Sequence, residues 1–214
     1  MSFIKITIAL ILSQLILACS SLSEKSQFIS SEKNSSYNLP ISSMKVFIDV
    51  SVIGAAGANI KNIAQEHSDA SKGLVNSFKA KMNAAGVAAI VKPFGTVTHT
   101  VTVEGPKTTT SLKRQGIGNE EMIAGESSKL QPILIVRIGS TQAKYNVWNG
   151  MVSWNLELVD PSVWTIKNNA TIWKGETKPM PFSPSYCSAD TYKTCSDKFS
   201  ELVVTQLRTE KIIK

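Results

Sequence analysis

Alternation of apolar and polar side chains predicts that most of the chain after residue 43 forms short β-strands. Residues 44–53 place Val46, Ile48 and Val50 on one face, which indicates a strand buried on one side. Residues 146–160 show the clearest alternation along the chain. Similar patterns predict a buried strand at 87–91, an edge strand or hairpin arm at 95–103, a central strand at 130–138 and an antiparallel return strand at 163–174.

Two stretches follow a period of 3.6 residues instead, which indicates helices. The first, residues 68–85, carries an apolar stripe and ends at Gly86, a residue suited to the left-handed position after a helix. The second, residues 198–213, has an apolar face that includes Phe199 and Leu207. The side chains expected to cap the two N-termini are Ser68 or Ser71 and Ser196 or Asp197.

The predicted elements follow the order β-α-β-β-β-β-β-α. This order indicates an α+β fold with a single mixed or antiparallel sheet of about five to six strands and two helices packed on one face. Residues 107–129 show no period. A segment of that length is either a functional loop or contains an element that the pattern does not reveal.

An apolar stretch at residues 6–17 follows Lys5 near the start of the chain. It is too short to span a bilayer as a stable helix, but it has the length of the apolar region of a signal peptide. We therefore expect residues 1–18 to be a signal peptide.

The stretch ends in Ile16-Leu17-Ala18-Cys19, which resembles the lipobox of bacterial lipoproteins. The resemblance implies a diacylglycerol thioether on Cys19, with several acyl chains anchoring the protein to a membrane. Ser20 at the next position favours the outer membrane, with the protein facing the periplasm. The alternative is cleavage after Ser20, which would release a soluble secreted protein.

Residues 20–43 contain ten serines and no apolar period. Such a sequence cannot bury enough surface to offset the entropy of ordering it, so we expect residues 19–43 to be the lipidated cysteine and a flexible tether. The expected root-mean-square span of the tether is about 25–30 Å. The periplasmic domain is then expected to occupy residues 44–214.

Composition indicates a globular domain with a basic surface. Of 214 residues, 43% are hydrophobic and 18% are charged, and the formal net charge is +7. The basic residues are dispersed, with no dense run beyond Lys113-Arg114, which excludes a nucleic-acid footprint. The basic balance is compatible with an anionic lipid surface or an acidic envelope polymer. We expect no cofactor.

Two cysteines, Cys187 and Cys195, remain beside the one in the lipobox. In an oxidising compartment they are expected to form a disulfide, and the short loop between them would contribute about 2–3 kcal/mol. Metal binding is the alternative, but it needs more ligands and neither histidine is near in the sequence. We therefore expect no metal site.

Residues that could carry catalysis are present but do not form a recognisable motif. His67 lies in a helix-entry sequence and His99 lies in a strand of threonine and valine. Asp49 and Glu157 are expected on solvated strand faces. We identify no catalytic residue and do not expect an enzyme. Four tryptophans would either pack in the core or form an aromatic surface for sugar rings: Trp148, Trp154, Trp164 and Trp173.

Several motifs together resemble a family of envelope lipoproteins. They are MKVFIDVSV at 44–52, FKAKMNAAG at 78–86, PILIVRI at 132–138, WNLELVD at 154–160 and IWKG at 172–175. With the lipobox and the closing helix, they resemble the α/β domain of CsgG-, LpoB- and PelC-type or TolB-N-like lipoproteins.

This resemblance implies a non-enzymatic binding or accessory module of a cell-envelope assembly, which docks to an envelope protein or polymer. Two alternatives stay open: a periplasmic enzyme acting on cell-wall or glycan substrates, and a subunit of a ring-forming export channel. In the channel, residues 95–111 would form a membrane hairpin. The sequence leaves the oligomeric state open.

Overall fold

The computed structural model describes the backbone of residues 27–50, 60–94, 96–104, 107–115, 131–138, 151–163, 170–183, 186–187 and 192–214. Side chains are described for the same residues except 60–64 and 96–115. Cys19 and residues 1–18 lie outside the described residues.

A mixed six-stranded sheet forms the centre of the molecule, with the strand order β1-β9-β8-β6-β2-β3. β2 pairs in parallel with β3 and β6, and the other neighbouring strands are antiparallel. In the order of the sheet, the strands are Phe28–Lys33, Thr171–Thr177, Trp154–Val159, Ile133–Ile138, Ser43–Asp49 and Ala88–Phe94. The predicted α+β fold is confirmed.

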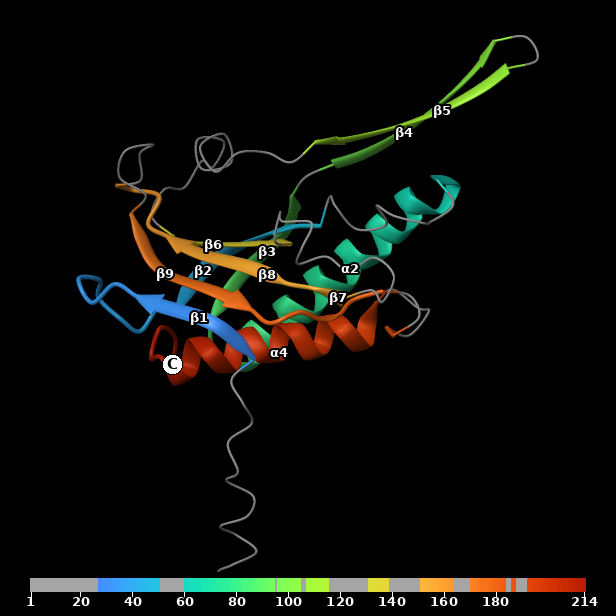
Figure 1. Ribbon diagram of the computed structural model, residues 1–214. Helices are drawn as coiled ribbons and strands as arrows, with labels where there is room; N and C mark the ends of the chain where they lie inside the picture. The colour runs from blue at the N-terminus through green and yellow to red at the C-terminus, as the bar shows by residue number, and fades with distance from the viewer. Residues whose placement is uncertain are drawn as a thin grey trace, which may run out of the picture.

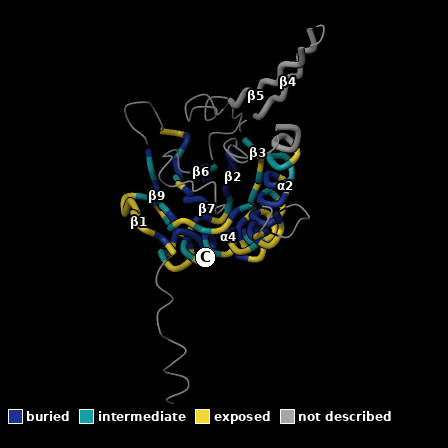
Figure 2. Tube along the Cα trace, turned by 45° about the vertical axis from the view of Figure 1, so that its right-hand side comes forward, coloured by how far each residue is buried: buried dark blue, intermediate teal, exposed yellow. Residues whose placement is uncertain are grey.

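Two helices, α2 (Ile60–Ala84) and α4 (Lys193–Thr209), lie side by side on one face of this sheet (Figure 1). Their apolar stripes and the inward residues of the strands form the main core, which is the dark blue interior of Figure 2. Phe78 of α2 and Phe199 of α4 meet edge to face at 5.6 Å between ring centroids. Among the described residues, no helix is long and apolar enough to cross a membrane.

The helix boundaries differ from the predicted ones at their N-termini. α2 begins at Ile60, so Ser68 and Ser71 lie inside the helix and do not cap it. α4 begins at Lys193, so Ser196 and Asp197 lie inside the helix and do not cap it. The stop at Gly86 is confirmed: its φ is 74°, and Val87 N–H donates to the carbonyl of Met82.

β1 corrects the expectation that residues 19–43 are a tether and that the domain begins at Met44. Residues 28–33 pair along β9 and form one edge of the sheet. Phe28 is buried in the main core, whereas the other five residues of β1 are exposed. A polar edge strand with one buried anchor has no apolar period, which is why the sequence pattern does not reveal it.

Two further predictions about strands need correction. β3 is an edge strand in which exposed and half-buried residues alternate, and not the buried strand expected at 87–91. Part of the predicted loop at 107–129 is a strand: β5 (Lys107–Gln115) pairs with β4 (Thr96–Glu104). The predicted hairpin arm at 95–103 is confirmed as β4, and the hairpin extends away from the sheet and helices (Figure 1).

The strands near residue 150 are shorter than predicted. Of residues 146–160, the described part forms β7 (Met151–Val152) and β8, and β7 pairs with β10 (Met180–Pro181) in a separate small sheet. β9 is the antiparallel partner of β8, as predicted, but it covers residues 171–177.

Candidate binding face of the sheet

The face of the sheet opposite the helices carries a hollow of about 540 Å³. Its lining comes from four neighbouring strands, β1, β9, β8 and β6. The lining residues are Ser30, Glu32, Ile135, Arg137, Asn155, Leu156, Glu157, Lys174, Gly175 and Glu176.

Strand register arranges the side chains of this hollow in two rows that cross the sheet. Along each strand, every second residue faces this side, and paired residues of neighbouring strands lie opposite each other. One row contains Ile135, Glu157, Lys174 and Glu32, and the second contains Arg137, Asn155, Glu176 and Ser30. We call these eight residues the polar grid.

Glu157 of the grid lies between two polar neighbours. Its carboxylate accepts a hydrogen bond of 2.9 Å from the hydroxyl of Thr171 and lies 3.8 Å from the ammonium of Lys174. Lys174 is itself half exposed, so its charge is open to a ligand as well.

Arg137 fixes the other end of the grid. Its guanidinium lies 3.5 Å from the carboxylate of Asp49 and above the ring of Phe94, 6.0 Å from the centroid. Asp49 is 8% exposed, so the expectation that it lies on a solvated strand face is wrong. Next to this pair, Phe47 and Ile133 belong to a small apolar cluster on the same face.

The polar surface continues around the end of the sheet. A second hollow of about 450 Å³ shares Glu32 and Lys174 with the grid and adds Lys33, Asn34 and Ser35. Hydroxyl, amide, carboxylate and ammonium groups therefore lie along one open surface. Such groups can hydrogen-bond a hydroxylated polymer or the backbone of another polypeptide.

The motif I-W-K-G at residues 172–175 lies in β9 and packs that strand of the grid against the helix side of the sheet. Trp173 is fully buried on the helix side, and its indole N–H donates to Glu210 at 2.8 Å. A Cβ atom on Gly175 would lie 2.5 Å from the Trp173 ring. Glycine at this position therefore allows the indole to lie flat beneath β9.

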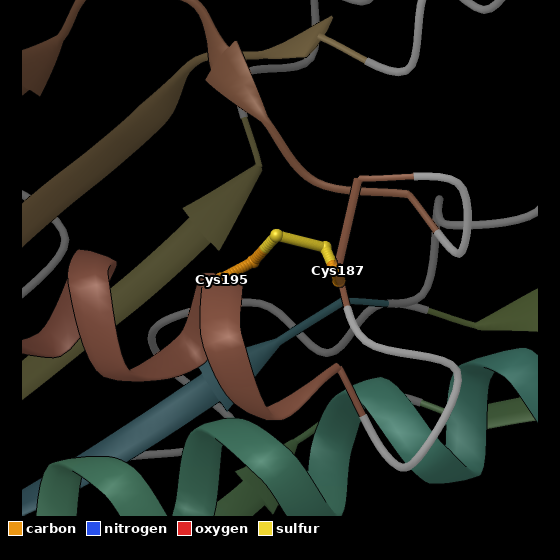
Figure 3. The surroundings of a disulfide bond; sticks show 2 residues. All are labelled: Cys187 and Cys195. Carbon is orange, nitrogen blue, oxygen red and sulfur yellow. A yellow bond between two sulfur atoms is a disulfide. The ribbon is translucent and has the colours of Figure 1, made fainter.

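The predicted disulfide between Cys187 and Cys195 is present, with 5.1 Å between the Cα atoms (Figure 3). It joins the segment before α4 to the first turn of that helix. Both cysteines belong to the main core and not to the polar grid. Nearby, the ring of Phe182 stacks on Tyr192 at 5.2 Å, which fixes the same segment.

The other residues singled out in the sequence do not join the grid, except Glu157. His67 is half-buried on α2, and His99 lies in β4, where only the backbone is described. Trp154 and Trp173 are fully buried, so both have the packing role. Trp148 and Trp164 lie outside the described residues. Among the residues that the structure describes, no cluster of three or more potential metal ligands is present.

Sequence reasoning missed most of the grid: Ser30, Glu32, Arg137, Lys174 and Glu176. The sequence signal for these residues is the set of polar positions that alternate with apolar ones along each strand, as at Asn155 and Glu157. Bringing the four strands together required the pairing register, which alternation within one strand does not contain.

The fold and this face define an α+β protein with helices on one side of its sheet and an open polar surface on the other. The chain matches no protein-family profile and no curated protein. Among solved structures it is similar to the PelC dodecamer from Paraburkholderia phytofirmans, with 12% identity, coverage of 86% of this chain and 98% of that one, and a TM-score of 0.36. A second PelC dodecamer structure from the same organism gives 10% identity, the same coverages and a TM-score of 0.34. Such scores do not establish a common fold.

Proposed function

We propose that this protein is a lipoprotein of the cell envelope, anchored through Cys19, whose periplasmic domain is a non-enzymatic docking module. The observation that carries the docking role is the polar grid, an open array of charged and polar side chains on the sheet face without helices. The lipobox sequence at residues 16–19 carries the anchoring role. The outer membrane is the proposed location.

The chemistry of the grid supports docking to a polar partner. Three carboxylates, two cations, an amide and a hydroxyl line one shallow surface formed by four paired strands. A rigid sheet presents these groups without the cost of ordering loops, which favours recognition. An envelope protein or an envelope polymer both offer matching hydrogen-bond groups.

Metabolic labelling with palmitate tests the anchor. The full chain should be labelled and recovered in the membrane fraction, and mass spectrometry should find an acylated Cys19 at the mature N-terminus. The Cys19→Ser variant should be unlabelled. A mature protein that begins elsewhere and carries no acyl chain would exclude the proposed anchoring.

Photocrosslinking in intact envelopes tests the docking face. A photoreactive residue at Asn155, exposed within the grid, should trap one stoichiometric partner, and Glu157→Gln combined with Lys174→Gln should reduce that adduct. The matched control is the same residue at Thr205, which is exposed on α4. Equal adducts from both positions, or none from Asn155, would contradict a role for the grid.

A further inference from the structure

The distance between the anchor and the folded domain is short. β1 begins at Phe28, so only residues 20–27 separate it from Cys19. However those residues are arranged, nine Cα–Cα steps span at most about 30–32 Å. A domain the size of residues 28–214 has a radius of gyration of about 16 Å and a diameter of about 40 Å. A chain this short cannot reach around the domain, so the side that carries Phe28 stays near the lipid.

That side is the edge of the sheet where β1 lies beside α4, and it borders the outer surface of α2 and α4, which we call the helix layer. Gln206 of α4 donates to the hydroxyl of Ser31, and Lys33 donates to the carbonyl of Glu210 at 2.9 Å. β1 and α4 therefore run side by side in the same direction, and the start of β1 lies beside the middle of α4 (Figure 1). The polar grid lies on the opposite face of the sheet.

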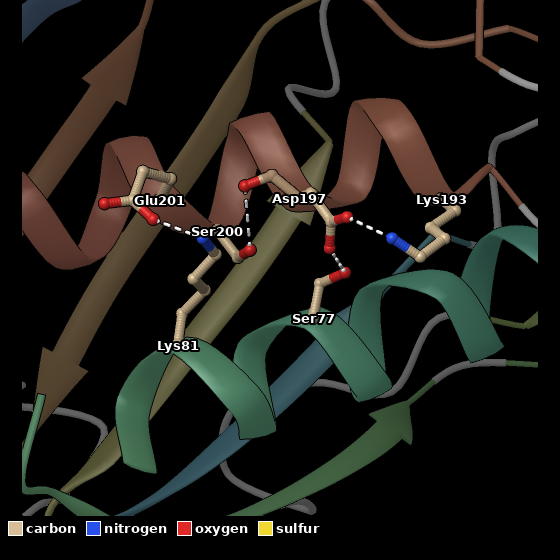
Figure 4. A network of polar contacts seen from close by, with 6 residues as sticks. All are labelled: Ser77, Lys81, Lys193, Asp197, Ser200 and Glu201. Carbon is tan, nitrogen blue, oxygen red and sulfur yellow. Dashed lines mark hydrogen bonds and ion pairs between the residues drawn. The ribbon is translucent and has the colours of Figure 1, made fainter. Parts of the chain in front are cut away.

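The helix layer has a net positive charge, because residues 65–84 and 193–214 contain eight lysine and arginine residues and five acids. In residues 65–84 and 193–214, the only exposed acid is Glu201, and Lys81 forms an ion pair with it. Asp197 is bound by Lys193 and Ser77 (Figure 4). The exposed cations of these two segments are Lys72, Lys79, Lys193, Lys198, Arg208, Lys211 and Lys214.

On the opposite face, four acids are matched by four cations: Glu32, Asp49, Glu157 and Glu176, and Lys45, Lys92, Arg137 and Lys174. The excess of exposed cations over exposed acids in residues 65–84 and 193–214 therefore lies on the helix layer, next to the sheet edge from which the chain to Cys19 departs. Clustered lysine and arginine side chains within a Debye length of anionic headgroups are attracted to them, and salt weakens the attraction.

We propose that the helix layer rests on the headgroups of anionic phospholipids in the leaflet that holds the acyl chains of Cys19. This inference rests on the proposed lipid anchor. The helix layer then acts as a second, electrostatic attachment, and it turns the polar grid away from the membrane toward the periplasm.

Lysine footprinting of the lipidated full-length product tests this orientation. The protein is reconstituted into phosphatidylcholine vesicles with or without about a quarter of phosphatidylglycerol, and exposed lysines are acetylated and quantified by mass spectrometry. Acetylation of Lys79, Lys198 and Lys211 should slow at least about three-fold in the anionic vesicles, and about 0.5 M salt should restore it. Lys92 and Lys174, on the other face, should not change.

Charge reversal provides the matched variants. Lys198→Glu combined with Lys211→Glu should remove the protection of Lys79, whereas Lys92→Glu should leave it intact. If the protein floats with the vesicles but both lysine sets react alike, the orientation is overturned and the anchor stands. If the protein does not float with any vesicle, both proposals fall.

Discussion

At the scale of single residues, Gly175 shows how a small side chain positions a large one. The Cβ of an alanine would lie 2.5 Å from the Trp173 ring and 2.9 Å from the Phe28 ring, and both rings are buried. Gly175→Ala should therefore lower the free energy of unfolding by about 1–3 kcal/mol, the range for overpacking a core. Urea unfolding measures this.

The control is Gly86, where a Cβ atom would meet nothing within 4 Å and only the positive φ favours glycine. Asparagine tolerates this backbone conformation, so Gly86→Asn should cost well under about 1 kcal/mol. Equal stability of Gly175→Ala and the unmodified protein would contradict the packing explanation.

Asp197 links the two helices through a charge that depends on pH. Hydrogen bonds from Lys193 and Ser77 lower the pKa of this carboxyl group below its ordinary value (Figure 4). Its contribution is therefore complete above the unfolded pKa of about 3.9 and is lost as the pH falls through the lower, folded-state pKa. Because the group is partly solvated, Asp197→Asn should cost at most about 1 kcal/mol at pH 7.

The stability difference between Asp197→Asn and the unmodified protein should shrink below about pH 4, as measured by chemical unfolding at a series of pH values. Lys198→Gln, at the next and exposed position, should show no such dependence. A difference that stays constant to low pH would contradict the assigned role of Asp197.

At the scale of elements, β1 is where sequence and structure differ most. Phe28 is 6% exposed and packs edge to face on Trp173, whereas Ile29 beside it is 56% exposed. Phe28→Ala should destabilise the domain by about 3 kcal/mol, and Ile29→Ala should cost about 0.5 kcal/mol or less. Thermal unfolding compares the two. If residues 28–33 were a tether, both variants would match the unmodified protein.

Helices and strands whose apolar residues form a clear pattern were predicted well, and strands held only by hydrogen bonds to a neighbouring strand were not. Both helices bury one face, so their apolar residues recur at the helix spacing, whereas the central strands β2 and β6 are buried along almost their whole length and are therefore rich in apolar residues. β1 and β5 are polar strands whose partners lie elsewhere in the chain or in a hairpin. Neither leaves a periodic signal in the sequence.

The candidate site could be predicted only in part for the same reason. Asn155 and Glu157 stand out as the polar half of one alternating strand. Their neighbours Lys174 and Glu32 join them through the β8–β9 and β9–β1 registers. The disulfide could be predicted from the expected oxidising compartment and from the short spacing between Cys187 and Cys195, because two nearby cysteines in such a compartment have few other partners.

At the scale of the whole molecule, the starting point of β1 determines how the proposed anchor acts. Nine Cα–Cα steps from Cys19 to Phe28 keep the helix layer at a high effective concentration near the lipid surface, and this concentration falls as roughly the −3/2 power of the linker length. Inserting about 16 Gly and Ser residues after Ser23 should therefore lower it about four- to five-fold.

In the footprinting experiment, the protection of Lys198 in anionic vesicles should decrease accordingly, while flotation with the vesicles stays complete because the acyl chains are unchanged. The control carries the same insertion after Lys214, which lengthens the chain without moving the domain from its anchor. Unchanged protection with the long linker would mean that the helix layer holds to the membrane without help from the short tether. Loss of protection in both insertions would mean that the added chain itself disturbs the surface.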